Sequence, residues 1–345
     1  MRYMIKMRYM KKSLWRILPV ALLLFYLLMG CDNHSEEKSK SSALEPVVAR
    51  LKWLPGVTYI GSIIAQQAGF WKEEGLDVTI KPGGFEADPI KLVASGAEQF
   101  GITGGDQLLQ ARANGVPIVA IFAELRFSPV GWMSLQESSI KTPHDLIGKK
   151  VGTMAGTNVE PMFDALVAKL NIDATKIKKV PVTFSMAPLF SGQVDALPVY
   201  LHGQPVEVAL EGKKIDTINP ADYGIQLMGN VVFTSEKLIK ERPELVNKYI
   251  KGLLRAWQAS LAEPDKYVDM MLKVTPGLKR EIELASFKAM RPFILGAGPN
   301  EIGLMDPAQW QQTFDLLVHY AALPSGLKVE EAYDNSFIKA AYDGK

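Results

Sequence analysis

The stretch LKWLPGVTYIGSIIAQQAGFWKEEGLDVTIKPGG, residues 51–84, decides how we interpret the chain. It opens with a short strand-like run that ends at Trp53, and an apolar helix is predicted over residues 59–68. Gly69 ends that helix, because glycine readily takes the left-handed conformation that closes a helix. From Leu76 to Lys81 apolar and polar residues alternate, which is typical of a strand. Strand, helix and strand together predict an α/β unit whose loops form one wall of a ligand crevice.

The rest of the chain continues this alternation. Asp88 and Pro89 begin a helix as N-cap and first-turn proline. A second series of strands and helices follows, before residues 231–234 return the chain to the first series. The alternation predicts an α/β fold with largely parallel sheets. We expect two lobes joined by two hinge crossings, near residues 127–132 and 232–235. Lobe 1 comprises residues 46–128 and 236–345, and lobe 2 comprises residues 129–235. Further strands are predicted at residues 100–102, 117–123, 130–135, 150–152, 179–182 and 194–197.

The N-terminus has the pattern of an export signal. Residues 1–16 carry six basic residues and no acid, and residues 17–29 are apolar apart from one proline. That run is short for a membrane span and fits the apolar part of a signal peptide. Leu28-Met29-Gly30-Cys31 resembles a lipoprotein box, in which the cysteine sulfur takes a lipid. We predict a signal peptide over residues 1–30, a lipid anchor on Cys31 and a flexible tether over residues 31–45. The alternative is an uncleaved anchor with an incidental cysteine, and both interpretations place the domain outside the cytoplasmic membrane.

Composition narrows the classes of function. A hydrophobic fraction of 48% in 345 residues is enough for a large core. Cys31 is the single cysteine, which excludes a disulfide within the chain and a cysteine-based zinc site. Without the six basic residues of the signal, the chain has 33 Lys and Arg against 37 Asp and Glu, so its net charge is negative. The sequence therefore predicts no nucleic-acid partner. The four His show neither Ser-His-Asp nor HExxH spacing. We therefore predict no catalytic residues, no metal and no cofactor.

Several segments resemble a known family. KWLPGVTYIG and then QQAGFWKEEGLDVTIKPGG are similar to the start of ABC-transporter solute-binding proteins, in the group that resembles the fungal thiamine-pyrimidine synthase. The similarity continues through GITGGDQLLQARANGVPIVAIFA and KKVGTMAGTNVEPMFDALVAKL. The resemblance implies a periplasmic-binding-protein type II fold, a small-molecule ligand, and ABC permease and ATPase subunits as partners. We expect a monomer that is held at the cell membrane by its lipid.

Candidate ligand contacts lie where predicted strands end. Aromatic rings at these ends can stack on flat heterocycles, although each ring taken singly is more often a core residue. The Gly105-Asp106 pair lies at a helix N-terminus, where backbone N–H groups can hold a polar ligand atom and where an acid also stabilises the helix dipole. Thr157 and Asn158 occupy the matching place in lobe 2 and can equally cap a helix. The aromatic candidates are Trp53, Tyr59, Phe85 and Tyr200.

Two further candidates rest on the resemblance. It places Asp195 on a lobe 2 strand that leads to the ligand loop, where the carboxylate either contacts ligand or fixes the loop through backbone hydrogen bonds. The related transport proteins tend to carry an Asn-Glu-Pro-like ending where this chain has Gly203-Gln204-Pro205. The amide of Gln204 still offers one acceptor and two donors.

The sequence leaves more than one function open. A lipid-anchored carrier for a thiamine pyrimidine precursor comes first, on the resemblance and on the supply of aromatic residues. Riboflavin or a similar ring system is the second ligand class, and an alkanesulfonate or another small anion is the third. In the loops expected to face the cleft the one arginine is Arg126, which argues against a strong anion. The other classes are an enzyme like the pyrimidine synthase, which the resemblance implies would carry a cysteine-rich motif, and an extracellular sensor.

Overall fold

The computed structural model describes residues 43–84, 86–154, 157–183, 185–295, 301–321 and 323–344. The predicted signal peptide, the lipid-bearing Cys31, most of the tether and the candidate Phe85 lie outside these residues. Residues 43–345 form one compact unit. Within the described residues, no helix combines the length and the apolar character that crossing a membrane requires.

A five-stranded mixed sheet has the order β2-β1-β3-β10-β4. β1 pairs in parallel with β2 and β3, whereas β10 lies antiparallel between β3 and β4. The prediction of a largely parallel sheet is therefore wrong for β10, because an apolar run does not reveal the direction of a strand. The first strand also ends at Arg50 rather than at Trp53. The strands are β1 (Glu45–Arg50), β2 (Leu76–Lys81), β3 (Phe100–Gly104), β4 (Ile118–Ala123) and β10 (Asn230–Ser235).

Two smaller sheets have the orders β8-β5-β9 and β6-β7. β5 is antiparallel to both of its neighbours, and β6 and β7 are parallel. The strand predicted at residues 194–197 is found at Leu197–Tyr200, and β9 was not predicted. The strands are β5 (Val130–Leu135), β6 (Lys150–Thr153), β7 (Lys178–Pro181), β8 (Leu197–Tyr200) and β9 (Ile215–Ile218).

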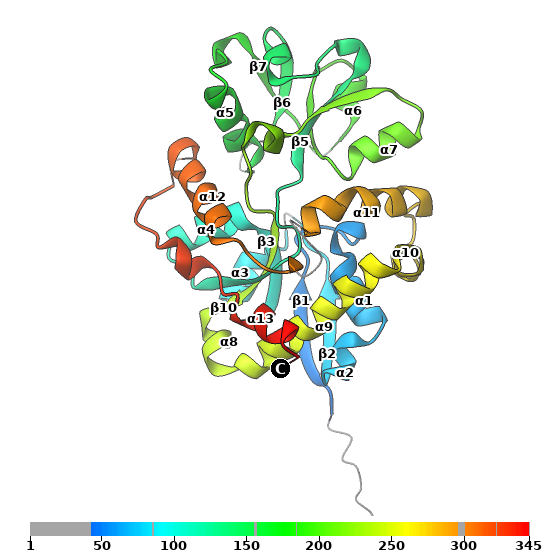
Figure 1. The fold of residues 1–345 in the computed structure, drawn as a ribbon, viewed down its shortest axis with the longest axis vertical. Helices are drawn as coiled ribbons and strands as arrows, with labels where there is room; N and C mark the ends of the chain where they lie inside the picture. The colour runs from blue at the N-terminus through cyan, green and yellow to red at the C-terminus, as the bar shows by residue number, and fades with distance from the viewer. Residues whose placement is uncertain are drawn as a thin grey trace, which may run out of the picture. The chain divides into compact units, whose positions relative to one another are not determined.

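We call the five-stranded sheet with its helices lobe 1, and the two smaller sheets with theirs lobe 2 (Figure 1). β10 pairs within the lobe 1 sheet, so the second crossing lies before Asn230 and not at residues 232–235 as predicted. The crossings are residues 124–129, between β4 and β5, and residues 224–229, which precede β10.

The helices divide between the two lobes. The lobe 1 helices are α1 (Ile60–Gln67), α2 (Phe70–Glu73), α3 (Pro89–Ala94), α4 (Gly105–Ala113), α8 (Glu236–Glu241), α9 (Pro243–Ala262), α10 (Pro264–Leu272), α11 (Arg280–Leu295), α12 (Pro307–Tyr320) and α13 (Ser336–Tyr342). The lobe 2 helices are α5 (Val159–Lys169), α6 (Ala187–Phe190) and α7 (Gln204–Leu210).

Local chemistry explains where several helices begin and end. Asp88 caps α3 as predicted, since its carboxylate accepts the N–H of Ile90 at 2.9 Å. Gly69 separates α1 from α2 with φ 82°, in the left-handed region that favours glycine. These signals lie within a few residues of the features they control, so the sequence alone reveals them.

The core of lobe 1 covers both faces of its sheet. One buried cluster joins β1, β2 and β3 to α1 and α9, and a second joins β4 and β10 to α4 and α12. In the first cluster the ring of Tyr249 stacks on the rings of Trp71 and Phe100, with centroids 4.8 and 3.8 Å away. The edge of β4 is protected from further pairing, because its backbone bonds to residues 303 and 334.

Gly61 gives a test of the packing between α1 and α9. A Cβ at this position would lie 2.1 Å from Trp257 Nε1. We expect Gly61→Ala to destabilise the protein by about 1–3 kcal/mol through overpacking, although alanine is the better helix former. Urea unfolding measures the difference. Gly326→Ala is the control, because a Cβ there meets no atom within 4 Å. Equal unfolding midpoints for the two variants would contradict the packing described here.

Candidate functional site

Three polar side chains meet at one edge of the lobe 1 sheet. Lys52 follows β1, Asp106 lies in the first turn of α4 after β3, and Asn230 begins β10. Antiparallel pairing places Asn230 opposite Gly104, the last residue of β3. Since β1 and β3 are parallel, their carboxyl ends share this edge, which is the usual ligand position in open α/β sheets. The register of β10 therefore brings together groups that are far apart in the sequence.

Side chains of lobe 2 complete this cluster. Tyr200 ends β8, and its hydroxyl accepts a hydrogen bond from Lys52 Nζ at 3.5 Å. The same ammonium donates to Asn230 Oδ1 at 3.4 Å. Close by, Thr58 Oγ1 of lobe 1 lies 3.2 Å from His202 Nε2 of lobe 2. Two pairs of side chains therefore join the lobes at the carboxyl end of the lobe 1 sheet.

Several atoms of this cluster lack partners. Asp106, Asn230 and His202 are each only 2% exposed. Within the described part of the chain, nothing forms a hydrogen bond with Asp106 Oδ1, Asn230 Nδ2 or His202 Nδ1. A buried polar atom without a partner costs about 1–3 kcal/mol, so native proteins rarely keep one for structure alone. An acceptor and a donor, at Asp106 and Asn230, are thus available to a ligand beside the Lys52 ammonium.

Three titratable side chains of the cluster have shifted pKa values. Burial alone would lower the pKa of Lys52, but Tyr200 and the Asp106 carboxylate together raise it, so the ammonium stays protonated. Burial raises the pKa of Asp106, and the Lys52 charge partly offsets this effect. Burial lowers the pKa of His202 to about 4, so its ring is neutral at pH 7. The Lys52 ammonium and the Asp106 carboxyl therefore lie side by side at the site, and the His202 ring adds no charge.

Gly104 makes room for the two charged groups. A Cβ here would lie 2.3 Å from Asp106 Oδ1 and 3.2 Å from Lys52 Nζ. Its φ of −73° suits any residue, so space and not backbone conformation requires the glycine. The two charged groups therefore occupy the volume that a side chain on Gly104 would fill.

A second buried carboxyl lies next to this edge. Glu124 follows β4, is 0% exposed and donates its backbone N–H to Asn230 O at 2.9 Å. Ser62 Oγ donates to its Oε1 at 3.3 Å. Burial raises the pKa of Glu124 to about 8. The pKa of Tyr59 is also raised, first by burial and then by Tyr200 and Glu124.

The structure brings some of the predicted site residues together. Asp106 and Tyr200 are in the cluster. Gly105 lies next to Asp106, and its N–H donates to Gly229 O of the second crossing at 2.9 Å. Trp53 follows Lys52, is half-buried and packs against the lobe 1 core. Tyr59 is only 4% exposed and belongs to that core.

Other predicted residues bond to the backbone of lobe 2. Asp195 Oδ2 accepts the N–H of Lys150 at 2.7 Å, and Gln204 Oε1 accepts the N–H of Tyr200 at 3.0 Å. Thr157 Oγ1 donates to Met154 O at 2.7 Å and accepts the N–H of Val159. Asn158 precedes α5 and its side chain makes no cap there. For Asp195 the geometry agrees with the alternative of a fixed loop, and ligand contact by these residues stays a prediction.

Sequence reasoning missed Lys52, Asn230 and the Thr58–His202 pair. The motifs around them gave no sign that these side chains would be buried together. A lysine beside an exposed turn is usually solvated, and Asn230 becomes a neighbour of Lys52 only through β10. The position of Lys52, at the end of the first predicted strand and next to Trp53, was the one available signal.

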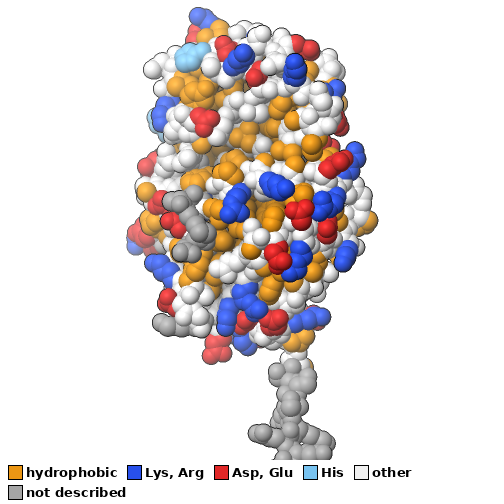
Figure 2. All heavy atoms as spheres, turned by 45° about the vertical axis from the view of Figure 1, so that its right-hand side comes forward, with side chains coloured by type: hydrophobic (Ala, Val, Ile, Leu, Met, Phe, Trp, Pro, Cys, Tyr) orange, Lys and Arg blue, Asp and Glu red, His pale blue; other side chains and the backbone are white. Residues whose placement is uncertain are grey.

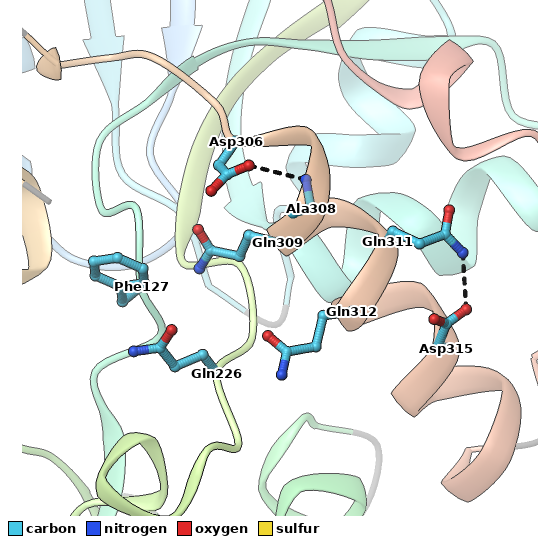
Figure 3. A pocket seen from close by; sticks show the side chains of 8 residues that line it. All are labelled: Phe127, Gln226, Asp306, Ala308, Gln309, Gln311, Gln312 and Asp315. Carbon is cyan, nitrogen blue, oxygen red and sulfur yellow. Dashed lines mark hydrogen bonds between the residues drawn. The ribbon is translucent and has the colours of Figure 1, made fainter. Parts of the chain in front are cut away.

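Two cavities lie away from the cluster. One, of about 580 Å³, lies beside α12 and the crossings and is lined by Phe127, Gln226, Gln309 and Gln312 among others (Figure 3). The other, of about 700 Å³, lies on lobe 2 beside Phe190 and Lys213. Neither contains the unpartnered atoms of Asp106, Asn230 and His202, so the cluster remains our candidate for the ligand site. Among the described residues, no group of three or more His, Cys, Asp or Glu could hold a metal ion.

The surface carries no single large charged patch on the face drawn in Figure 2, where basic and acidic side chains alternate over lobe 1. Arg126, the arginine expected near the cleft, is 9% exposed and forms an ion pair with Glu301. Its charge is therefore already neutralised within lobe 1.

Comparison with known proteins decides the family. A family model described as NMT1/THI5 like matches residues 57–267. The chain belongs to this family. The predicted resemblance to thiamine-pyrimidine-synthase-like proteins is thereby confirmed.

Curated relatives of this NMT1/THI5-like protein match nearly its whole length. It is 27% identical to the formylaminopyrimidine-binding protein of Halalkalibacterium halodurans, over 91% of this chain and 96% of the relative. It is 23% identical to the riboflavin-binding protein RibY of Chloroflexus aurantiacus, over 94% and 97%. It is also 23% identical to the 4-amino-5-hydroxymethyl-2-methylpyrimidine phosphate synthase of Legionella pneumophila, over 86% and 94%. Binding proteins and synthases thus both occur among its relatives.

A solved structure confirms the predicted fold. The periplasmic aliphatic sulphonate binding protein SsuA from Escherichia coli superposes with a TM-score of 0.65 at 17% identity, covering 84% of this chain and 91% of that one. The fold is that of the periplasmic binding proteins.

Glu124 predicts a pH dependence of stability. Its pKa of about 8 in the folded protein exceeds the ordinary 4.5. The native protein therefore holds a proton that the unfolded chain releases above about pH 4.5. The resulting stabilisation is complete below that pH and is lost as the pH rises through about 8. We expect Glu124→Gln to remove a slope of up to about 1.4 kcal/mol per pH unit between pH 5 and 8.

Urea unfolding at a series of pH values measures this slope. Glu211→Gln, at an exposed position after α7, is the control and should keep the wild-type slope. A Glu124→Gln variant with an unchanged slope would show that Glu124 is ionised in the folded protein.

Proposed function

We propose that this protein is the solute-binding component of an ABC importer and holds a small, uncharged planar heterocycle between its two lobes. The observation that carries the proposal is the cluster shared by the lobes. It presents an unpartnered acceptor, Asp106 Oδ1, and an unpartnered donor, Asn230 Nδ2, beside Lys52 and Tyr200. A ligand that donates to Asp106 Oδ1 and accepts from Asn230 Nδ2 would satisfy both.

A thiamine pyrimidine precursor is the ligand class that we favour. An aminopyrimidine carries ring nitrogens that accept and amino groups that donate, in one plane. The name of the formylaminopyrimidine-binding relative supports this assignment. Riboflavin is the second candidate, because a flavin also presents donors and acceptors on a flat edge and one relative is named for it.

A sulfonate fits the cluster less well. A strong anion needs an excess of donors and positive charge. Here the Asp106 carboxylate faces the same space as the Lys52 ammonium, and Arg126 is paired with Glu301. The charge balance therefore favours a neutral ligand.

We also propose that the protein is a carrier and not an enzyme, although synthases occur among its relatives. The single cysteine is Cys31, so the domain contains no cysteine-rich motif. Lys52 has a raised pKa, which keeps its nitrogen protonated and unsuited to nucleophilic attack. Both features support binding without chemistry.

We propose, finally, that a lipid on Cys31 anchors the protein at the outer face of the cytoplasmic membrane, where a permease and its ATPase receive the ligand. The basic and apolar segments before Cys31 support this assignment. The protein would act as a monomer, since capture needs only the two lobes of one chain.

The ligand class is tested by calorimetry with three probes. We expect 4-amino-5-hydroxymethyl-2-methylpyrimidine to bind, and riboflavin and an alkanesulfonate to bind more weakly or not at all. Asp106→Asn should raise the Kd of the pyrimidine about 10–100-fold, because it removes a charge-assisted hydrogen bond. Asp77→Asn, at an exposed position on β2, is the control. Tight binding of the sulfonate, or turnover of the pyrimidine to a product, would contradict the proposal.

The anchor is tested by metabolic labelling with radioactive palmitate. The full-length protein should incorporate label and sediment with membranes. Cys31→Ser should remove the label, because no other thiol exists in the chain. Undiminished label in Cys31→Ser would place the lipid elsewhere, and an unlabelled full-length protein would exclude it.

A further inference from the structure

One amide side chain ties the two crossings together. Gln309 lies in the first turn of α12 and is 6% exposed. Its Nε2 donates to Arg126 O of the first crossing at 2.6 Å and to Leu227 O of the second at 3.2 Å. Figure 3 shows this side chain pointing from α12 toward Phe127 and the crossings.

Thr313 adds a third bond from the next turn of the same helix. Its Oγ1 accepts the N–H of Met228 at 2.8 Å and donates to Gln309 O at 2.8 Å. The crossings also bond to each other, because Ser128 N donates to Leu227 O at 2.9 Å. Both crossings are thus fixed to the first two turns of α12.

The same helix packs on both lobes. Trp310, Phe314 and Leu317 belong to a lobe 1 core cluster, whereas Leu316 belongs to the main lobe 2 cluster. α12 contacts α4 of lobe 1 and α5 of lobe 2. A change in the angle between the lobes must therefore either move α12 against one core or break its bonds to the crossings.

We propose that Gln309 is a positioning residue for ligand capture: by bonding both crossings to α12, it holds the lobes at the angle that brings Lys52 to Tyr200 and Thr58 to His202. The proposal rests on the proposed function, because it concerns binding at the shared cluster. Gln309 acts without touching the ligand, since it lies on the cavity beside α12 and not in the cluster. Apparent affinity falls with the fraction of molecules at the binding angle, so loosening this clamp weakens binding.

The test compares Gln309→Met with Gln311→Met. Methionine keeps the length of glutamine and removes its donors. Gln311 lines the same cavity and is exposed, and among the described residues its side chain bonds only along its own helix, to Asp315 at 2.8 Å. We expect Gln309→Met to raise the Kd of 4-amino-5-hydroxymethyl-2-methylpyrimidine about tenfold, through the lost hydrogen bonds and the lower competent fraction. Gln311→Met should bind as the wild type does.

A second measurement separates this clamp from the ligand assignment. Small-angle X-ray scattering of the unliganded proteins should show a larger radius of gyration for Gln309→Met than for the wild type and Gln311→Met. Equal radii and equal affinities for the two variants would overturn the clamp. If the wild type binds no heterocycle, the ligand proposal fails while the scattering comparison still decides the clamp. Should Gln309→Met not fold, Thr313→Val removes the bond to Met228 and takes its place in both measurements.

Discussion

The ammonium of Lys52 is partly buried at the place where the two lobes meet. Burying a charge is expensive unless other groups compensate it, and here the compensation comes from three different elements. Asp106 belongs to α4, Asn230 to β10 and Tyr200 to β8, while Lys52 itself follows β1. The site therefore exists only when both sheets are formed and the lobes are in contact. The proposed binding site therefore forms only together with the tertiary structure.

Much of lobe 1 could be predicted because its signals are local. The left-handed Gly69, the Asp88 cap and the alternation in β2 each depend on a few neighbouring residues. β10 shows the limit of such signals. Its apolar run was recognised as a strand, but its antiparallel insertion between β3 and β4 depends on pairing with residues more than a hundred positions earlier. Asn230 enters the site through that pairing alone, so no local pattern could have identified it.

The predicted site residues in lobe 2 illustrate a different limit. Polar side chains often bond to backbone N–H groups of the protein itself, and the sequence cannot distinguish this use from ligand contact. The Asp195 carboxylate accepts the backbone N–H of Lys150, and the Gln204 amide oxygen accepts that of Tyr200. The bond from Tyr200 N to Gln204 nevertheless bears on the site, because it fixes the backbone from which the Tyr200 ring extends. The unusual Gly203-Gln204-Pro205 ending thus has a supporting role that an alignment of endings would not reveal.

Ligand selectivity at such a site depends on which buried polar atoms of the protein a given ligand leaves without a hydrogen-bond partner. A ligand without a donor would leave Asp106 Oδ1 buried and unpaired, and discrimination of that kind is strong where pocket size alone discriminates weakly. In the proposed complex the polar cluster contacts one edge of a ring and places no constraint on the rest of the ligand. Pyrimidine and flavin can share such an edge, so the choice between them must come from the surroundings, including the half-buried Trp53. The angle between the lobes sets the distance from the ligand to those surrounding residues. The proposed clamp at α12 and the charged pair at Lys52 therefore both affect how well a ligand fits the site.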